Sequence, residues 1–291
     1  MFVRIVVAAA VALLLVGCGA YNATPATSLS ARPPGLTLDS PTVNALRPLP
    51  ADVDAAWQRA VAACMNGQGV KYAMLASNRS LANSSLLGVR GFLDVQSAST
   101  DGYGFFAPRP LSSATETESF RHAWGGASPT TVTASGDSGD MSITTSGCQG
   151  TASLAIYGDL QTAVRQMVTQ NDFRIATNNG IGPDDEQAMA APLAAYVACM
   201  TKHGHDVASP DAAQDYARTE FLRDDPAQSA TPSELAFAVD DAKCQSSAHY
   251  LDATDRIALD AASDWIATHK DAIADLAQWR DATIARAAAT P

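Results

Sequence analysis

Two short cysteine motifs each occur twice in this chain of 291 residues, and their order constrains the fold more than any other feature. Cys64 and Cys199 each begin the pattern Cys-Met-x-x-x-Gly, whereas Cys148 and Cys244 each begin Cys-Gln-x-x-Ala. Apolar residues precede both Cys-Met pairs at helical spacing, which predicts a helix that ends at the following glycine. The order helix, Cys-Met, glycine, insert, Cys-Gln, helix therefore occurs twice, and the sequence predicts two related units.

The repeat also favours one pairing of the cysteines. The chain has five cysteines, and four remain when Cys18, which lies in the first 18 residues, is set aside. An even number of cysteines in an exported protein favours disulfides, and four cysteines allow three pairings. If each unit closes on itself, the pairs are Cys64–Cys148 and Cys199–Cys244. Chance similarity of two short motifs is the alternative, and it would leave the pairing open. The cysteines lie at least 45 residues apart. Zinc sites usually contain close Cys-x-x-Cys pairs, so we expect no metal.

The first 18 residues indicate where the chain is located. Arg4 precedes an apolar run from Ile5 to Val16, which suits a signal peptide and is shorter than the roughly 20 residues that span a bilayer. The segment Leu15-Val16-Gly17-Cys18 resembles the lipobox of bacterial lipoproteins. We therefore expect removal of residues 1–17, lipid on Cys18, and attachment to the outer face of the cytoplasmic membrane. The alternatives are an ordinary secretory signal with a chance cysteine and an uncleaved anchor helix.

Composition divides the rest of the chain. Residues 18–50 are expected to be a tether, because 6 of the 15 prolines fall there among small polar residues. The remaining residues can form one or two domains, and the repeat predicts a first unit at 51–183, with a polar insert at 88–147, and a second unit at 184–291. The net charge of −11 disfavours nucleic acid as a partner, because acidic surfaces repel phosphates.

The predicted fold class is α+β and predominantly helical. Within the insert, residues 130–133 and 141–145 are typical of two short strands, and residues 136–139 are typical of the turn between them. Another bend or edge strand is expected at 102–106.

A long amphipathic helix is predicted at the C-terminus. The chain has no glycine or proline between Ser233 and Thr290, and Leu259, Ile266 and Ile273 recur every seven residues opposite a row of aspartates. Unbroken, this helix would be roughly 85 Å long, and the two serines before Ala248 are the expected bend. Its apolar stripe either packs on the core, which we favour, or binds a partner.

Three fragments are similar to functional motifs. Gly136-Asp-Ser-Gly139 resembles the nucleophile motif of trypsin-like proteases, but its composition also suits a hairpin turn. His203-Gly-His205-Asp206 could supply metal ligands, yet the glycine is better explained as a helix stop. Asp184-Asp-Glu186 follows a proline and is expected to open a helix, where acids favour the helix dipole. We therefore expect no catalytic residues, no metal site and no cofactor.

The whole pattern resembles a group of secreted actinobacterial lipoproteins of unknown function, over about Trp57 to Asp281. The residues that carry the resemblance are Cys64-Met65-x-x-x-Gly69, Gly147-Cys148-x-x-x-Ala152 with Tyr157-Gly158-Asp159, Cys199-Met200-x-x-x-Gly204, and the segment from Glu234 to Cys244. This group typically has an aromatic residue where the present chain has Val70 and His205. The resemblance implies no activity, substrate or catalytic residue.

Two functions are consistent with these features. The first is a non-enzymatic binding or accessory protein, attached to the membrane through Cys18 and directed at an envelope protein. The alternative is an envelope hydrolase with its site in the insert at 88–147, because long polar loops often carry function. A small-molecule ligand is not indicated by the sequence, which also leaves the oligomeric state open.

Overall fold

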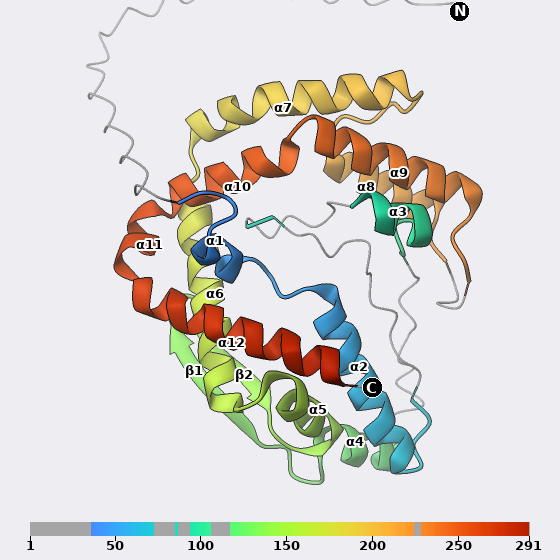
Figure 1. The fold of residues 1–291 in the computed structure, drawn as a ribbon. Coiled ribbons are helices and arrows are strands. Elements are labelled where there is room, and N and C mark those ends of the chain that lie inside the picture. Colours follow the sequence, from blue (N-terminus) through green and yellow to red (C-terminus); the bar gives the residue numbers. More distant parts are fainter. Residues whose placement is uncertain (1–35, 73–84, 87–93, 106–116, 224–227, 291) are drawn as a thin grey trace, which may run out of the picture. The chain divides into compact units, whose positions relative to one another are not determined.

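The computed structural model describes residues 36–72, 85–86, 94–105, 117–223 and 228–290 (Figure 1). The predominantly helical α+β class is confirmed, since the described residues form helices and one two-stranded antiparallel sheet. No helix among them combines the length and the hydropathy that a membrane span requires. The lipobox and Cys18 lie outside the described residues, so lipid attachment remains a prediction.

The described residues form twelve helices and two strands, and both strands lie between α4 and α5. Their bounds are α1 (Pro41–Leu46), α2 (Ala51–Gly67), α3 (Val95–Asp101), α4 (Glu118–Gly125), β1 (Thr131–Gly136), β2 (Gly139–Thr144), α5 (Gly147–Tyr157), α6 (Leu160–Gly180), α7 (Pro183–Lys202), α8 (Pro210–Glu220), α9 (Pro232–Ser247), α10 (Tyr250–Ala261), α11 (Ser263–Thr268) and α12 (Lys270–Ala289).

Both predicted disulfides are present, and each joins two packed helices. The first disulfide, Cys64–Cys148, connects α2 to α5, and the second disulfide, Cys199–Cys244, connects α7 to α9. The Cα atoms of each pair are 5.5 Å apart, a usual distance for a disulfide. The pairing inferred from the internal repeat is therefore confirmed.

The two glycines after the Cys-Met pairs end their helices in the same way. Gly69 and Gly204 adopt left-handed backbone conformations, with φ of 75° and 87°. The amide of Val70 donates to the carbonyl of Met65, and the amide of His205 donates to that of Met200, both at 3.0 Å. This is the closing bond of a Schellman motif, in which glycine avoids the steric cost of positive φ. The helix stops predicted at both glycines are confirmed.

The predicted hairpin forms in the insert. β1 and β2 pair in register from Thr131 opposite Thr144 to Gly136 opposite Gly139, and both strands pack on α6. A Cβ on Gly136 would lie 2.3 Å from a side-chain carbon of Val168, so only glycine allows this close approach. The fragment that resembles a protease motif is therefore a hairpin turn.

The two units share packing and do not form separate domains. All the described residues, from 36 to 290, belong to one compact unit. α12, from the second predicted unit, packs on α1, α2, α5 and α6, whereas α3, from the insert of the first, packs on α9. The boundary predicted between residues 183 and 184 is thus a boundary of the repeat and not of a folded domain.

The end of the predicted tether belongs to the folded body. α1 begins at Pro41 with Ser40 as its N-cap, and Val43 and Leu46 are buried beside Ile273 and Leu276. The Arg280 guanidinium also donates to the backbone carbonyls of two residues that follow α1. The sequence predicts a tether through residue 50, whereas a helix begins at Pro41, because proline is favoured in the first turn of a helix.

The C-terminal segment is helical as predicted but is divided into α9, α10, α11 and α12. The first break lies at His249, which adopts a left-handed conformation with φ of 49°, just after the predicted bend. Ile266 and Ile273 are 3% and 2% exposed, whereas Asp264 and Asp271 face solvent. The apolar stripe therefore packs on the protein's own core, as favoured above, and does not form a free helix face.

Candidate functional site

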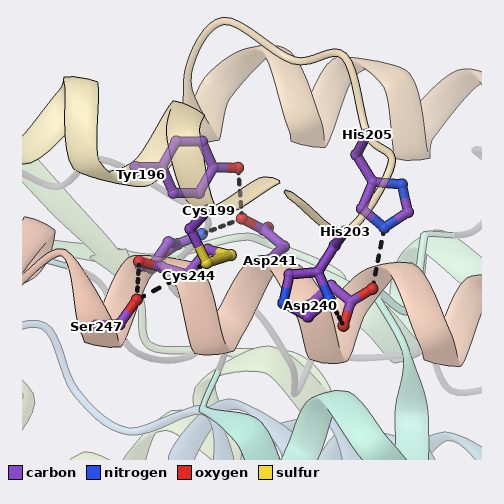
Figure 2. Close-up of a disulfide and its surroundings, with 9 residues drawn as sticks. Tyr196, Cys199, His203, His205, Asp240, Asp241, Cys244 and Ser247 are labelled. Atoms are coloured by element: carbon purple, nitrogen blue, oxygen red, sulfur yellow. Dashed lines mark hydrogen bonds and ion pairs between the residues drawn. A yellow bond between two sulfur atoms is a disulfide. The ribbon is translucent and has the colours of Figure 1, made fainter. Parts of the chain in front are cut away.

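A polar cluster lies beside the second disulfide, where α7 ends and α9 passes beneath it (Figure 2). α7 begins at Pro183, and the carboxylate of Asp185 accepts a hydrogen bond from the amide of Gly182 at 2.7 Å. The last turn of α7 carries Cys199, and the helix ends at Lys202. Gly204, in the turn that follows, has a positive φ. The helix stop therefore places His203 and His205 on the same short turn, directly after the disulfide-bonded cysteine.

One carboxylate of α9 holds both imidazoles. Oδ1 of Asp240 lies 3.2 Å from Nδ1 of His203, and Oδ2 lies 3.0 Å from Nε2 of His205. The side chains of His203, His205 and Asp240 are 39%, 24% and 22% exposed, so the group is accessible to solvent. Each imidazole therefore has one nitrogen oriented by the carboxylate and a second nitrogen that is available for other chemistry.

The first unit provides an internal comparison for this group. Gln68 occupies the position equivalent to His203, and its amide nitrogen lies 3.3 Å from Sγ of Cys148. Val70 occupies the position equivalent to His205 and packs on the core of the first unit. The backbone of the two turns is the same, so the imidazole pair is a difference in side-chain chemistry between the units.

Aromatic side chains continue the surface from His205. Its ring packs edge-on against Phe237 with centroids 4.7 Å apart, and Phe237 in turn contacts Tyr216 at 5.0 Å and Phe221 at 6.0 Å. Tyr216 and Leu222 are among the most exposed large apolar residues of the described chain, at 46% and 45%. The imidazole pair is therefore bordered on one side by an aromatic cluster in which Phe237 is buried and Tyr216 is exposed.

A buried acid lies directly behind the exposed one. Asp241 follows Asp240 on α9, and because successive helical residues point about 100° apart, it faces the core. Its Oδ2 accepts from the Tyr103 hydroxyl at 2.5 Å, whereas Oδ1 accepts from the Tyr196 hydroxyl at 2.7 Å and from Gln245 at 2.9 Å. The carboxylate thus ties α9 to α7 and to the residues after α3.

Burial sets the protonation of this network. Desolvation raises the pKa of the Asp241 carboxyl, and its three hydrogen bonds oppose that rise without cancelling it. Desolvation, and then the nearby carboxylate, raise the pKa of the Tyr103 hydroxyl and of the Tyr196 hydroxyl. Both phenols therefore remain protonated and act as donors.

A buried ion pair fixes the other end of α9. The Glu234 carboxylate is 1% exposed and lies 2.7 Å from the Arg223 guanidinium. It also accepts a hydrogen bond from the amide of Tyr103 at 3.1 Å. Gly102, with φ of 62°, leaves room for this carboxylate, because a Cβ there would lie 2.5 Å from its oxygen. These buried contacts hold α9 in place and are not part of the solvent-exposed surface of the site.

Three of the side chains in this cluster could bind a metal ion when the second disulfide is reduced. One ligand atom each of Cys199, His203 and Cys244 lies within 4.8 Å of the others. In the oxidised protein the two sulfurs are bonded to each other, so they are not thiolate ligands. Figure 2 shows His203 between the disulfide and Asp240, and the Ser247 hydroxyl contacts Sγ of Cys199 at 3.8 Å.

The structure locates the other candidate residues as follows. Asp185 and its acidic neighbours open α7, as predicted. Ser138 lies in the hairpin turn, where its amide donates to Asp172 at 2.7 Å. His203 and His205 do come together, but their acidic partner is Asp240 and not Asp206. No local pattern predicts Asp240 as this partner, because Asp240 lies 35 residues beyond His205.

Comparison with known protein families, with curated proteins and with solved structures finds no match for this chain.

Proposed function

We propose that the chain is a lipid-anchored protein on the outer face of the cytoplasmic membrane that binds an envelope partner and has no catalytic role. The location is supported by the lipobox ending at Cys18 together with two disulfides that pair within the folded body. Disulfides persist in oxidising compartments outside the cytoplasm, which agrees with export. A diacylated cysteine would anchor the chain stably.

The partner surface that we propose is the aromatic border of the second unit. The apolar stripe of α10 to α12 packs on the core and cannot serve a partner without unfolding. Tyr216, in contrast, is exposed and packs on Phe221 and Phe237, which support it from beneath, and the exposed Leu222 directly follows Phe221 in the chain. Aromatic side chains on a rigid base are typical of binding anchors. This patch, beside the imidazole pair, is the single observation that carries the binding proposal.

The anchor is tested in cells that are fed labelled palmitate. The wild-type chain should take up label and partition into the detergent phase. The Cys18→Ala variant should take up no label and should stay in the aqueous phase. Because only Cys18 is changed, the folded body should be unaffected. An unlabelled wild-type chain in the aqueous phase would refute the lipid anchor.

The binding surface is tested with a photo-cross-linking residue placed in turn at two exposed positions. Tyr216 lies in the proposed patch, and Leu154, on α5 of the first unit, is 59% exposed and serves as the matched control. Cross-linking in intact envelopes should yield a discrete adduct from position 216 and none from position 154. Equal adducts from both positions, or none from either, would contradict the proposed surface.

The envelope hydrolase alternative finds no favourable geometry in the described part of the insert. His122, the one histidine of that segment, is exposed, and its Nε2 lies 3.7 Å from Oε1 of Glu118. Ser138 is held in the hairpin turn by Asp172. Neither residue is positioned as a nucleophile with its base, so the binding proposal is preferred.

A further inference from the structure

We propose that the second disulfide is a redox-controlled zinc site, in which the thiolates of Cys199 and Cys244 and the imidazole of His203 bind one Zn²⁺ after the disulfide is reduced. The ligand atoms of these three side chains already lie within 4.8 Å of one another. They form the one such cluster of potential metal ligands in the described parts of the chain. The proposal does not rest on the partner surface proposed above, and at the envelope location it requires a dithiol reductant, because disulfides persist in oxidising compartments.

The ligand set suits zinc. Two thiolates and one imidazole are a recurring set of three protein ligands for zinc, with a fourth position left for water or substrate. In a tetrahedral site with Zn–S bonds of about 2.3 Å, the two sulfurs would be about 3.8 Å apart. Because the Cα atoms are 5.5 Å apart, rotation of the cysteine side chains achieves this separation without moving α7 from α9.

The environment orients the imidazole for this role. Asp240 lies against Nδ1 of His203 at 3.2 Å, which leaves Nε2 as the ligand atom. A carboxylate that accepts a proton from one nitrogen of a metal-binding histidine fixes its tautomer and raises its basicity. His203 is 39% exposed and Cys199 is partly exposed, so the ion can reach the site and the fourth position faces solvent.

The redox step balances with a dithiol reductant. The dithiol supplies two electrons and two protons, the bond between the sulfurs of Cys199 and Cys244 breaks, and the reductant leaves as its own disulfide. Zn²⁺ then displaces one proton from each thiol, and both protons go to solvent. In the reverse direction, a disulfide oxidant accepts the two electrons of the thiolates and takes two protons from solvent to become a dithiol, the bond between the sulfurs of Cys199 and Cys244 forms, and the ion is released.

The first unit lacks the third ligand and is therefore the natural control. Its equivalent of His203 is Gln68, which contacts the sulfurs of the first disulfide through an amide nitrogen without an available lone pair. The exchange His203→Gln therefore gives the second unit the side chain of the first. The reciprocal change Gln68→His places an imidazole beside the first disulfide.

The test measures zinc binding to the purified full chain, oxidised or reduced by a phosphine, which does not itself present thiols to the metal. The reduced wild type should bind one Zn²⁺ per chain, and the ion should raise its melting temperature. His203→Gln should weaken zinc binding at least tenfold, and Asp240→Asn should weaken it by about tenfold to a hundredfold. Oxidised wild type and oxidised His203→Gln should melt alike and bind no zinc.

Several outcomes would overturn the proposal. These are no zinc bound to the reduced wild type, equal affinity in His203→Gln, or equal affinity in the oxidised protein. If reduction unfolds the chain in part, the comparison remains decisive, because zinc should restore the melting transition of the wild type and not that of His203→Gln. A gain of a second zinc in reduced Gln68→His would support the assignment of the imidazole as the third ligand.

Discussion

Replacing Tyr103 by phenylalanine should destabilise the protein through the buried carboxylate of Asp241. Tyr103 and Asp241 are both completely buried, and the Tyr103 hydroxyl is the donor to Oδ2 of the carboxylate. The phenylalanine ring can keep the stacked contact with Phe105, whose centroid is 5.6 Å away. The change therefore removes one hydrogen bond and little packing.

The size of the loss in unfolding free energy depends on which hydrogen-bond donors remain for each carboxylate oxygen of Asp241. Loss of the Tyr103 hydroxyl leaves Oδ2 without its donor, which should cost about 1.5–3 kcal/mol, since a buried charged acceptor is left unsatisfied. Tyr196→Phe is the matched control, because Oδ1 keeps its bond from Gln245 at 2.9 Å. That change should cost only about 1 kcal/mol.

Urea unfolding of the oxidised chain at neutral pH, followed by circular dichroism, measures both free energies. Tyr103→Phe should lower the free energy of unfolding more than Tyr196→Phe does. A double variant with Asp241→Asn should show that the loss from Tyr103→Phe depends on the carboxylate. Equal losses from the two tyrosines, or a loss below about 0.5 kcal/mol for Tyr103→Phe, would refute the reasoning, because a change that size is typical of sites without special contacts.

Three further predictions concern the core, pH and the disulfides. Ile266→Asp should abolish cooperative unfolding, because an unpaired buried charge costs about 3–5 kcal/mol, whereas Asp264→Asn at the exposed neighbour should change the free energy by less than about 0.5 kcal/mol in the same urea titration. Because burial raises the folded-state pKa of Asp241 above its ordinary value of 3.8, the folded state binds more protons than the unfolded state above that pH. The stability of the wild type relative to Asp241→Asn should therefore fall as pH rises from about 4, and a relative stability that rises with pH would show the opposite shift. Serine pairs in place of the first or the second disulfide should lower the free energy of unfolding by at most about 4.5 and 4 kcal/mol, since the loops they close span 84 and 45 residues.

Local patterns in the sequence predicted much of the fold. Gly69 and Gly204 mark helix ends because a positive φ is a property of single residues and their immediate neighbours. The hairpin was equally predictable, since Gly136 and Gly139 flank its turn. The pairing of the disulfides required only that each unit close on itself. These features depend on short stretches of chain, so periodicity and residue type reveal them.

The remainder depends on contacts between distant residues. Nothing near Tyr103 indicates that its hydroxyl meets Asp241, which lies 138 residues away. The packing of α1 against α12 was missed for the same reason, because Pro41 alone cannot show whether a helix it starts will find a partner. The contact between Asp240 and His203 could not be predicted either, since a carboxylate on an amphipathic helix ordinarily faces solvent.

The pairing of the disulfides has a consequence for biogenesis. The four cysteines of the folded body pair in the order in which they occur along the chain. The first is joined to the second, Cys64 to Cys148, and the third to the fourth, Cys199 to Cys244. A chain that crosses the membrane from its N-terminus, as the proposed export requires, presents these thiols in that order. Oxidation of each newly emerged pair then yields the native bonds without reshuffling, so maturation should need an oxidase but no disulfide isomerase.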